Sequence, residues 1–344
     1  MRIAIISPPW VAVPPPAYGG TENVLDILAR ALQSAGYDVL LYATGDSRCP
    51  VELRYSFDAA LGVSVGGTVA ELRQVVDAYH AVREWGAEVV HDHTLAGPLY
   101  ANRFPELAVV TTNHGPFDGN LGKIYQEVAT RVPVIAISHH QASTARGVPI
   151  TAVIHHGVDL DRFPAGTGGG GYALFLGRMT AEKGVHVAAK VARAAGVPLR
   201  IAAKMREVPE REYFEEQVKP LLGGGVEYIG EVGAQEKMDL LAGATCLLNP
   251  IAWPEPFGMV MVEALACGTP VVTTPRGAAP EIVDDGVTGL VRAEESALVR
   301  ALAEVQELDR SACRRAVKER FSASRLASEH VDVYRQVAAT PRSR

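Results

Sequence analysis

The sequence predicts an α/β protein with two doubly wound, mostly parallel sheets, on three observations. The chain has 344 residues, a length typical of two domains. Short apolar runs alternate with segments of helical periodicity, which indicates parallel sheets covered by helices. A run of four glycines at residues 168–171 separates two such series near the middle of the chain. We expect this run to be a flexible linker, with a hinge near residues 160–171.

The first series begins with an apolar strand, which a loop rich in proline and glycine follows. Thr21 is the expected N-cap of the next helix, because apolar residues then recur at helical spacing until Gly36. Strands are expected at residues 2–7, 39–42, 89–90, 109–112 and 134–137, and helices near 22–35 and 69–85.

The second series starts after the glycine run and repeats the alternation. Strands are expected at residues 172–176, 199–203, 226–229, 245–248 and 271–272, and helices near 183–195 and 258–267. Ligands of such open sheets bind beyond the carboxyl ends of the strands. Two sheets therefore predict two ligand-binding edges, which can face each other across a cleft.

The composition is that of an ordinary globular protein and excludes several functional classes. Hydrophobic residues make up 48% of the chain and charged residues 21%, which excludes extensive disorder. The net charge is −6, so we expect no nucleic acid partner. The segment from residue 309 onward is basic, and we interpret it as a solvated helix face. The first helix carries Glu22, Asp26 and Arg30 rather than a basic face, so membrane association is not expected.

The apolar runs and the cysteines indicate the compartment. No uncharged stretch reaches the length of about 20 residues that a spanning helix needs. The N-terminus lacks the pattern of a signal peptide, so we expect a cytoplasmic protein. The 4 cysteines show no C-x-x-C spacing, which favours reduced, mostly buried thiols over a zinc site.

The segment WPEPFGMVMVEALACGTPVVTT, which begins at Trp253, carries the strongest chemical pattern. Glu255 lies in a loop between two prolines, and Gly258 opens the helix that carries Glu263. A helix N-terminus presents backbone N–H groups to an anion. Carboxylates can accept hydrogen bonds from sugar hydroxyls. The pattern therefore predicts a site for a phosphate or a sugar.

A second pattern, GRMTAEKG at residues 177–184, places two cations after a strand. Arg178 offers a planar fork of donors and Lys183 a compact charge. Two cations at the carboxyl edge of a sheet suit a diphosphate, whose negative charge grows as its bond to a sugar breaks. Gly19 and Gly20 precede the first helix and would let the backbone approach a ligand closely.

Taken in order, these motifs resemble the retaining glycosyltransferases of the GT-B fold, specifically glycosyltransferase family 4. The segment from Glu255 to Glu263 resembles the E-x7-E motif of the family, and residues 177–184 resemble its phosphate motif. YGGTE at 18–22 is similar to its N-terminal glycine loop, HHGVD at 155–159 to its interdomain segment, and GAAPEIVDDGVTGLV at 277–291 to its final donor-domain motif.

The resemblance implies two Rossmann-like domains that face each other across a cleft. Residues 1–155 would bind the acceptor, residues 160–322 would bind a nucleotide sugar, and the last helix, 323–339, would cross back to the first domain. The implied activity is a retaining, hexosyltransferase-type transfer from a nucleotide-diphosphate sugar, with UDP the most frequent nucleotide in the family. The expected acceptor is soluble, such as a secondary-metabolite or antibiotic oligosaccharide. A cell-envelope glycan is the alternative.

The resemblance also implies roles for individual residues. Arg178 and Lys183 would bind the diphosphate, Glu255 would orient the sugar, and Glu263 would hold the ribose. His114 would contact the transferred sugar, and His93 would lie near the acceptor. The remaining donor contacts would come from Gly19, Gly20, Phe257, Gly258, Met259 and Val260.

The sequence offers no convincing carboxylate nucleophile, so we expect front-face substitution, in which the leaving phosphate helps to deprotonate the acceptor. No metal ion is expected, because His91 and His93 share one face of a strand and are too few to hold one. Nothing in the sequence indicates an oligomeric state.

A sugar-nucleotide epimerase of the same fold is the nearest alternative function. An NAD-dependent dehydrogenase would need G-x-G-x-x-G between a strand and a helix, and neither residues 19–24 nor residues 168–173 meet this requirement. The presence of all four charged residues, Arg178, Lys183, Glu255 and Glu263, argues against a binding protein without catalysis.

Overall fold

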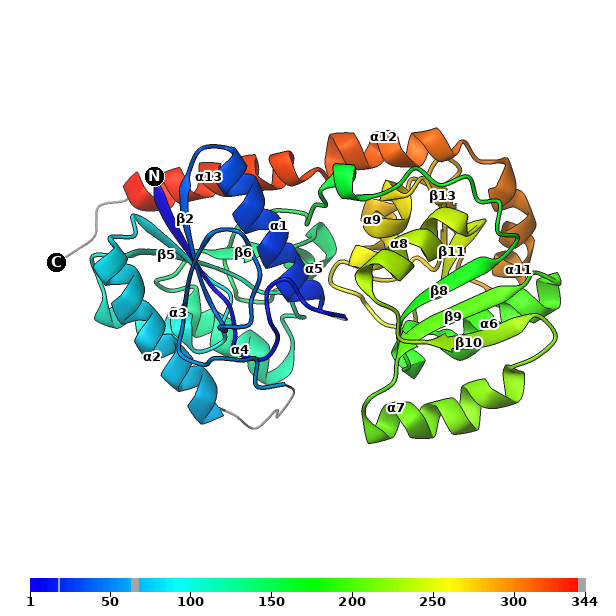
Figure 1. Ribbon diagram of the computed structural model, residues 1–344, viewed down its shortest axis with the longest axis horizontal. Helices are drawn as coiled ribbons and strands as arrows, with labels where there is room; N and C mark the ends of the chain where they lie inside the picture. The colour runs from blue at the N-terminus through cyan, green and yellow to red at the C-terminus, as the bar shows by residue number, and fades with distance from the viewer. Residues whose placement is uncertain (18, 63–67, 340–344) are drawn as a thin grey trace. The chain divides into compact units, whose positions relative to one another are not determined.

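The computed structural model describes residues 1–17, 19–62 and 68–339. The chain forms two compact units (Figure 1). Unit 1 comprises Met1–Gly157 together with the last helix, and unit 2 comprises Val158–Ser322. The chain therefore crosses between the units twice, after Gly157 and after Ser322.

Unit 1 is built on a parallel sheet of seven strands in the order β3-β2-β1-β4-β5-β6-β7. The strands are β1 (Arg2–Ile6), β2 (Asp38–Ala43), β3 (Glu52–Tyr55), β4 (Val89–Asp92), β5 (Ala108–Thr112), β6 (Val134–Ala136) and β7 (Ile150–Val153). The helices are α1 (Gly20–Ser34), α2 (Thr68–Trp85), α3 (Gly97–Tyr100), α4 (Gly119–Val128), α5 (His139–Thr144) and α13 (Ala323–Ala339). The strand order reverses between β1 and β4, so their carboxyl ends mark the expected ligand edge.

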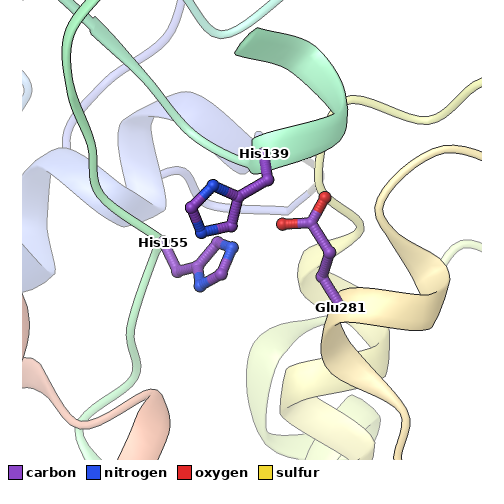
Figure 2. A group of neighbouring side chains, drawn as sticks. All are labelled: His139, His155 and Glu281. Carbon is purple, nitrogen blue, oxygen red and sulfur yellow. The ribbon is translucent and has the colours of Figure 1, made fainter. Parts of the chain in front are cut away.

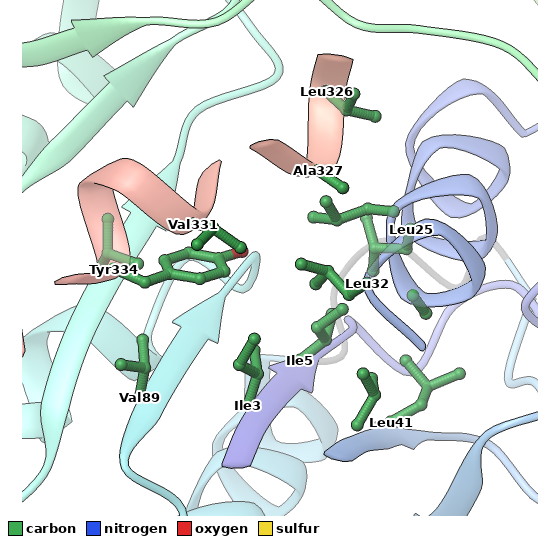
Figure 3. Close-up of a cluster of buried hydrophobic side chains, with 14 of the residues drawn as sticks. Ile3, Ile5, Leu25, Leu32, Leu41, Val89, Leu326, Ala327, Val331 and Tyr334 are labelled. Atoms are coloured by element: carbon green, nitrogen blue, oxygen red, sulfur yellow. The ribbon is translucent and has the colours of Figure 1, made fainter. Parts of the chain in front are cut away.

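The last helix completes the hydrophobic core of unit 1. Figure 3 shows Leu326 and Tyr334 of α13 among side chains of β1 and α1. Ile3 and Leu25 are fully buried there. These apolar residues are distant in sequence, and their burial stabilises the unit because apolar surface is removed from water.

Unit 2 repeats the architecture with a parallel sheet of six strands in the order β10-β9-β8-β11-β12-β13. The strands are β8 (Ala173–Arg178), β9 (Leu199–Lys204), β10 (Val226–Gly230), β11 (Cys246–Asn249), β12 (Val271–Thr273) and β13 (Gly289–Val291). The helices are α6 (Val185–Ala195), α7 (Val208–Tyr213), α8 (Ala234–Gly243), α9 (Met259–Ala266), α10 (Ala279–Ile282), α11 (Glu295–Glu304) and α12 (Arg310–Arg320). Here the order reverses between β8 and β11. The two sheets confirm the predicted α/β class.

The glycine run at 168–171 is not the linker that we expected. It lies inside unit 2, where the N–H groups of Gly168 and Gly170 donate to the carbonyl groups of Ala242 and Gly243. A Cβ at Gly170 would lie 2.8 Å from the carbonyl oxygen of Gly243. These glycines therefore allow two backbone segments to approach each other, and the prediction of a hinge in this run is wrong.

Two expectations about helix α1 are wrong. The N-cap of α1 is Gly19 rather than Thr21. Glu22 and Asp26 are buried, so they do not give the surface of α1 the acidic charge that we expected to oppose membrane binding. The cysteines are free and buried, as expected. Among the described residues, no helix combines the length and the apolar character needed to cross a membrane.

Candidate active site

The loops that follow β8 and β11 meet at the carboxyl edge of the unit 2 sheet. Gly184, in the first loop, has a φ of +77°, and a Cβ there would collide with the carbonyl oxygen of Pro250 in the second. The N–H of Ala252 donates to the carbonyl oxygen of Glu182 across the same contact, at 2.9 Å. Glycine is required here by both the positive φ and the close approach. The contact brings the two charged motifs of unit 2 together.

An ion pair joins these two motifs. Lys183 Nζ lies 2.5 Å from Glu255 Oε2, and the two side chains are only 14% and 13% exposed. The indole N–H of Trp253 donates to the same carboxylate oxygen, at 2.7 Å. Within the described part of the chain, no group hydrogen-bonds to Glu255 Oε1. The carboxylate is therefore held at one oxygen and open at the other.

The motif at residues 277–291 supports the loop that carries Glu255. Gly277 has a φ of +59°, and a Cβ there would collide with the main chain of Glu255. The N–H of Ala278 donates to the carbonyl oxygen of Glu255, at 2.9 Å. This motif therefore positions the main chain of Glu255.

Helix α9 presents its N-terminus next to this loop. Its N-cap, Gly258, has a φ of +105°, and Met259 and Val260 in the first turn are partly exposed. The side chain of Phe257 is buried, and its ring centroid lies 6.2 Å from that of Phe321. The helix N-terminus is thus available to an anion, whereas the Phe257 side chain belongs to the core.

Glu263 does not share the ion pair of Glu255 but has a lysine of its own. Its carboxylate is buried in α9, and Lys237 Nζ of α8 lies 2.5 Å from Oε1. Lys237 belongs to none of the motifs in the sequence. Only its place in α8, the helix that precedes α9 in the chain, could have pointed to it.

Arg178 ends β8 and stands in register with Lys204, which ends β9. Lys204 Nζ donates to Glu207 at 2.8 Å and to Glu210 at 3.3 Å. The hydrogen bond from Lys204, with a smaller contribution from Arg178, lowers the pKa of the Glu207 carboxyl. Sequence reasoning missed Lys204, although a lysine at the end of the neighbouring strand was a usable signal.

In unit 1, the predicted site histidines form a direct pair. His93 Nδ1 lies 2.9 Å from His114 Nε2, at the carboxyl ends of β4 and β5. Burial lowers the pKa of His114 to about 4 and holds the pKa of His93 well below its usual range. Both imidazoles are therefore neutral near pH 7. A neutral imidazole donates a hydrogen bond from one ring nitrogen and accepts one at the other, which suits a sugar hydroxyl.

His91 and Asp92, next to this pair in the chain, form hydrogen bonds with other residues of unit 1. His91 is bound on both sides, by the Tyr334 hydroxyl and the Thr112 hydroxyl, each at 2.8 Å. Asp92 accepts hydrogen bonds from Tyr79 and Thr94, and burial raises its pKa to about 6. His91 and Asp92 therefore hold unit 1 together around the pair.

The glycine loop before α1 has two different positions. A Cβ at Gly19 would lie 2.7 Å from Pro15 Cβ, whereas a Cβ at Gly20 would meet no described atom within 4 Å. Gly19 is therefore required by packing inside unit 1. Packing within the described residues sets no such requirement at Gly20. Tyr18 of the same motif lies outside the described residues.

Two more histidines lie near the end of unit 1. Figure 2 shows His139, at the start of α5, and His155, beyond β7, with ring centroids 5.6 Å apart. Glu281, also drawn there, belongs to α10 of the other unit. Within one unit these side chains amount to two histidines, which is fewer than a metal site needs.

Comparisons with known proteins match both parts of the chain to glycosyltransferases. The family model for Glycosyltransferase Family 4 matches residues 18–162, and the model for glycosyl transferases group 1 matches residues 160–320. The chain belongs to glycosyltransferase family 4. It is a glycosyltransferase of the GT-B fold that transfers a sugar from a nucleotide sugar.

Relatives of this glycosyltransferase have names that give different activities. It is 28% identical to a phosphatidyl-myo-inositol mannosyltransferase of Mycolicibacterium smegmatis, over 84% of this chain and 80% of the relative. It is 29% identical to an alpha-maltose-1-phosphate synthase of Mycobacterium tuberculosis, over 98% of this chain and 100% of the relative.

Solved structures share the fold. A glycosyltransferase involved in avilamycin A biosynthesis is 27% identical, with a TM-score of 0.78 over 99% of this chain and 98% of the other. HepE of Anabaena, solved with UDP and glucose, has a TM-score of 0.76 over 98% of this chain and 100% of the other, at 19% identity.

Proposed function

We propose that the protein is a retaining hexosyltransferase that uses a UDP-sugar and a soluble oligosaccharide acceptor of secondary metabolism. The similarity to a glycosyltransferase of avilamycin A biosynthesis supports this acceptor class. The alternative is a cell-envelope glycan, which the similarity to a phosphatidyl-myo-inositol mannosyltransferase favours.

The ion pair between Lys183 and Glu255 is the observation that carries the proposal. It brings a cation for the diphosphate and a carboxylate for the sugar hydroxyls within 2.5 Å, at the carboxyl edge of one sheet. A nucleotide-diphosphate sugar presents these two chemistries side by side, at the phosphate and the adjoining sugar ring. Glu263, held by Lys237, would accept hydrogen bonds from the ribose.

In the proposed reaction, the acceptor oxygen attacks the anomeric carbon from the face that the diphosphate leaves. The bond between the anomeric carbon and the phosphate oxygen breaks, and a leaving phosphate oxygen takes the proton of the acceptor hydroxyl. Arg178 and Lys183 would stabilise the charge that develops on the diphosphate. His114, neutral and next to His93, would hydrogen-bond the transferred sugar. No metal ion is required in this scheme, because the two cations take its role.

A product analysis tests the proposal. The protein is incubated with UDP-, GDP- and ADP-sugars, with candidate oligosaccharide acceptors and with EDTA present or absent. We expect UDP-sugars to give the highest turnover, EDTA to have no effect, and the product to keep the anomeric configuration of the donor, as read by NMR. An inverted product would disprove the retaining reaction. A changed donor sugar without an acceptor would identify an epimerase instead.

A further inference from the structure

The hydrogen bonds of Glu255 are distributed unevenly between its two oxygens. Lys183 Nζ and Trp253 Nε1 both donate to Oε2, at 2.5 Å and 2.7 Å. Within the described residues, Oε1 accepts no hydrogen bond. A carboxylate oxygen has about two lone-pair directions. Oε2 is therefore saturated by the protein, and Oε1 is left for a ligand.

Trp253 is held in place by its own loop. The N–H of Glu255 donates to the carbonyl oxygen of Trp253, at 2.8 Å, and the preceding residue, Ala252, is bonded to Glu182 of the neighbouring loop. Lys183 Nζ lies 5.6 Å from the centroid of the indole ring. The Trp253 side chain is only partly buried, so it is not a core residue. Its main polar contact is the bond to Glu255.

The two donors on Oε2 differ in what a bound donor substrate would do to them. The ammonium of Lys183 is mobile and charged, and a diphosphate would compete with Glu255 for it. The indole N–H is neutral, rigid and without affinity for a second acceptor once it has bonded to Oε2. It would stay on Glu255 while Lys183 turns to the phosphate.

We infer that Trp253 is a positioning residue of the transfer reaction, which holds the Glu255 carboxylate so that Oε1 faces a sugar hydroxyl while Lys183 serves the diphosphate. This inference rests on the proposed function of Glu255. Trp253 acts through Glu255 and does not itself touch the reacting atoms. It should affect turnover and sugar recognition, and leave the binding of the nucleotide unchanged.

The test replaces Trp253 by phenylalanine, which keeps an aromatic ring and removes the N–H. We expect Trp253→Phe to lower kcat by about tenfold with the best donor of the product analysis. The Kd for UDP alone, measured by calorimetry, should stay within about twofold, because the nucleotide contacts are unchanged. Trp85→Phe is the matched control, since the Trp85 indole donates to Glu52 at 2.8 Å in unit 1.

An NMR measurement on the wild-type protein gives a second readout that does not depend on activity. The chain has 3 tryptophans, so its indole N–H signals can be assigned with the two variants. Added UDP should leave the Trp253 indole N–H hydrogen-bonded, with slow exchange with water. An unchanged kcat in Trp253→Phe, or release of this N–H by UDP, would overturn the inference. An equal loss of UDP affinity would also overturn it, by placing Trp253 in the nucleotide site.

The proposed function and this inference fail in different ways. If the wild-type protein transfers from a GDP- or ADP-sugar, the proposed nucleotide is wrong. The kcat of Trp253→Phe relative to wild type, and the binding of the free nucleotide, are then measured with GDP or ADP in place of UDP. If it transfers from a UDP-sugar but Trp253→Phe is as active as wild type, only the role of Trp253 is wrong.

Discussion

The carboxyl edge of the unit 1 sheet carries neutral polar groups, whereas that of the unit 2 sheet carries charged ones. In unit 1 the site pair is His93 and His114, whose pKa values burial lowers so far that both rings are neutral. In unit 2 the corresponding edge carries the ion pair of Lys183 and Glu255. Of the 10 histidines in the sequence, only His186 belongs to unit 2.

The difference shows that two sheets of the same architecture can carry groups suited to chemically different ligands, charged in one unit and neutral in the other. Charged groups suit a diphosphate, because its charge rises during the reaction. Neutral imidazoles suit hydroxyl groups, since they offer a donor and an acceptor without attracting counterions. Under the proposed function, unit 2 would bind the nucleotide end of the donor and unit 1 would contact uncharged sugar.

Removal of the cations of unit 2 should have the largest effect. We expect Arg178→Ala/Lys183→Ala to lower kcat/KM by about 1,000-fold or more, because two charge-assisted contacts to the leaving diphosphate are lost. Steady-state kinetics and circular dichroism check this. Arg200→Ala is the control, because Arg200 pairs with Glu227 at the amino end of the same sheet. A double variant with normal kcat/KM would break the assignment of charge to unit 2.

Acid should destabilise unit 1 more than unit 2. Unfolded histidines bind protons below a pKa of 6.5, whereas His114 and His330 in the folded unit resist until about 4. The unfolded state therefore binds more protons in this window, so the free energy of unfolding falls as the pH falls from 6.5 to about 4. The loss should be on the order of a few kcal/mol. Hydrogen exchange resolved by peptide measures it, and an equal loss in residues 158–322 would contradict it.

Substitutions at the two glycines of the loop before α1 should have different effects, one on activity and one on stability. Under the proposed function, Gly20→Val should lower kcat/KM by about tenfold without changing Tm, because a side chain there would meet the donor and no described atom of the protein. Gly19→Ala should instead lower Tm, because its Cβ would lie 2.7 Å from Pro15 Cβ. A fully active Gly20→Val protein would show that this loop does not approach the donor.

The smallest effect is expected at membranes, where we predict no binding to anionic vesicles at physiological salt. The basic helix α12 uses its arginines inside unit 2. Arg310 donates to the carbonyl oxygens of Gly166 and Ala244, at 3.1 Å each, and Arg320 pairs with Asp284 at 2.6 Å. Co-sedimentation measures the binding. Tight association would show that enough basic charge remains exposed to bind a lipid surface.

The sequence predicted the elements that carry strong apolar runs, such as β8 and β11, and the two motifs that follow them. It did not predict β3, whose residues Glu52–Tyr55 are exposed or half-buried and show no apolar run. It also missed β13, which has only 3 residues. Short or half-buried strands depend on their neighbours, and local composition does not reveal them.

Motif spacing identified candidate residues of the site, but it did not identify the partners that come from other parts of the chain. Glu255 and Glu263 were identified as site candidates from their spacing, but their lysine partners differ, and Lys237 lies 26 residues from Glu263. The glycine run at 168–171 was misread, because flexibility and close backbone approach require the same composition. The roles of the site residues stay predictions.

The contribution of α13 to the core of unit 1 affects how the protein is made on the ribosome. Residues Val158–Ser322 are continuous, so unit 2 has all its parts while synthesis still proceeds. Unit 1 emerges first but lacks Leu326, Val331 and Tyr334, which are made after all of unit 2. The half-built unit therefore leaves part of its core uncovered during this interval, and such exposed apolar surface favours aggregation.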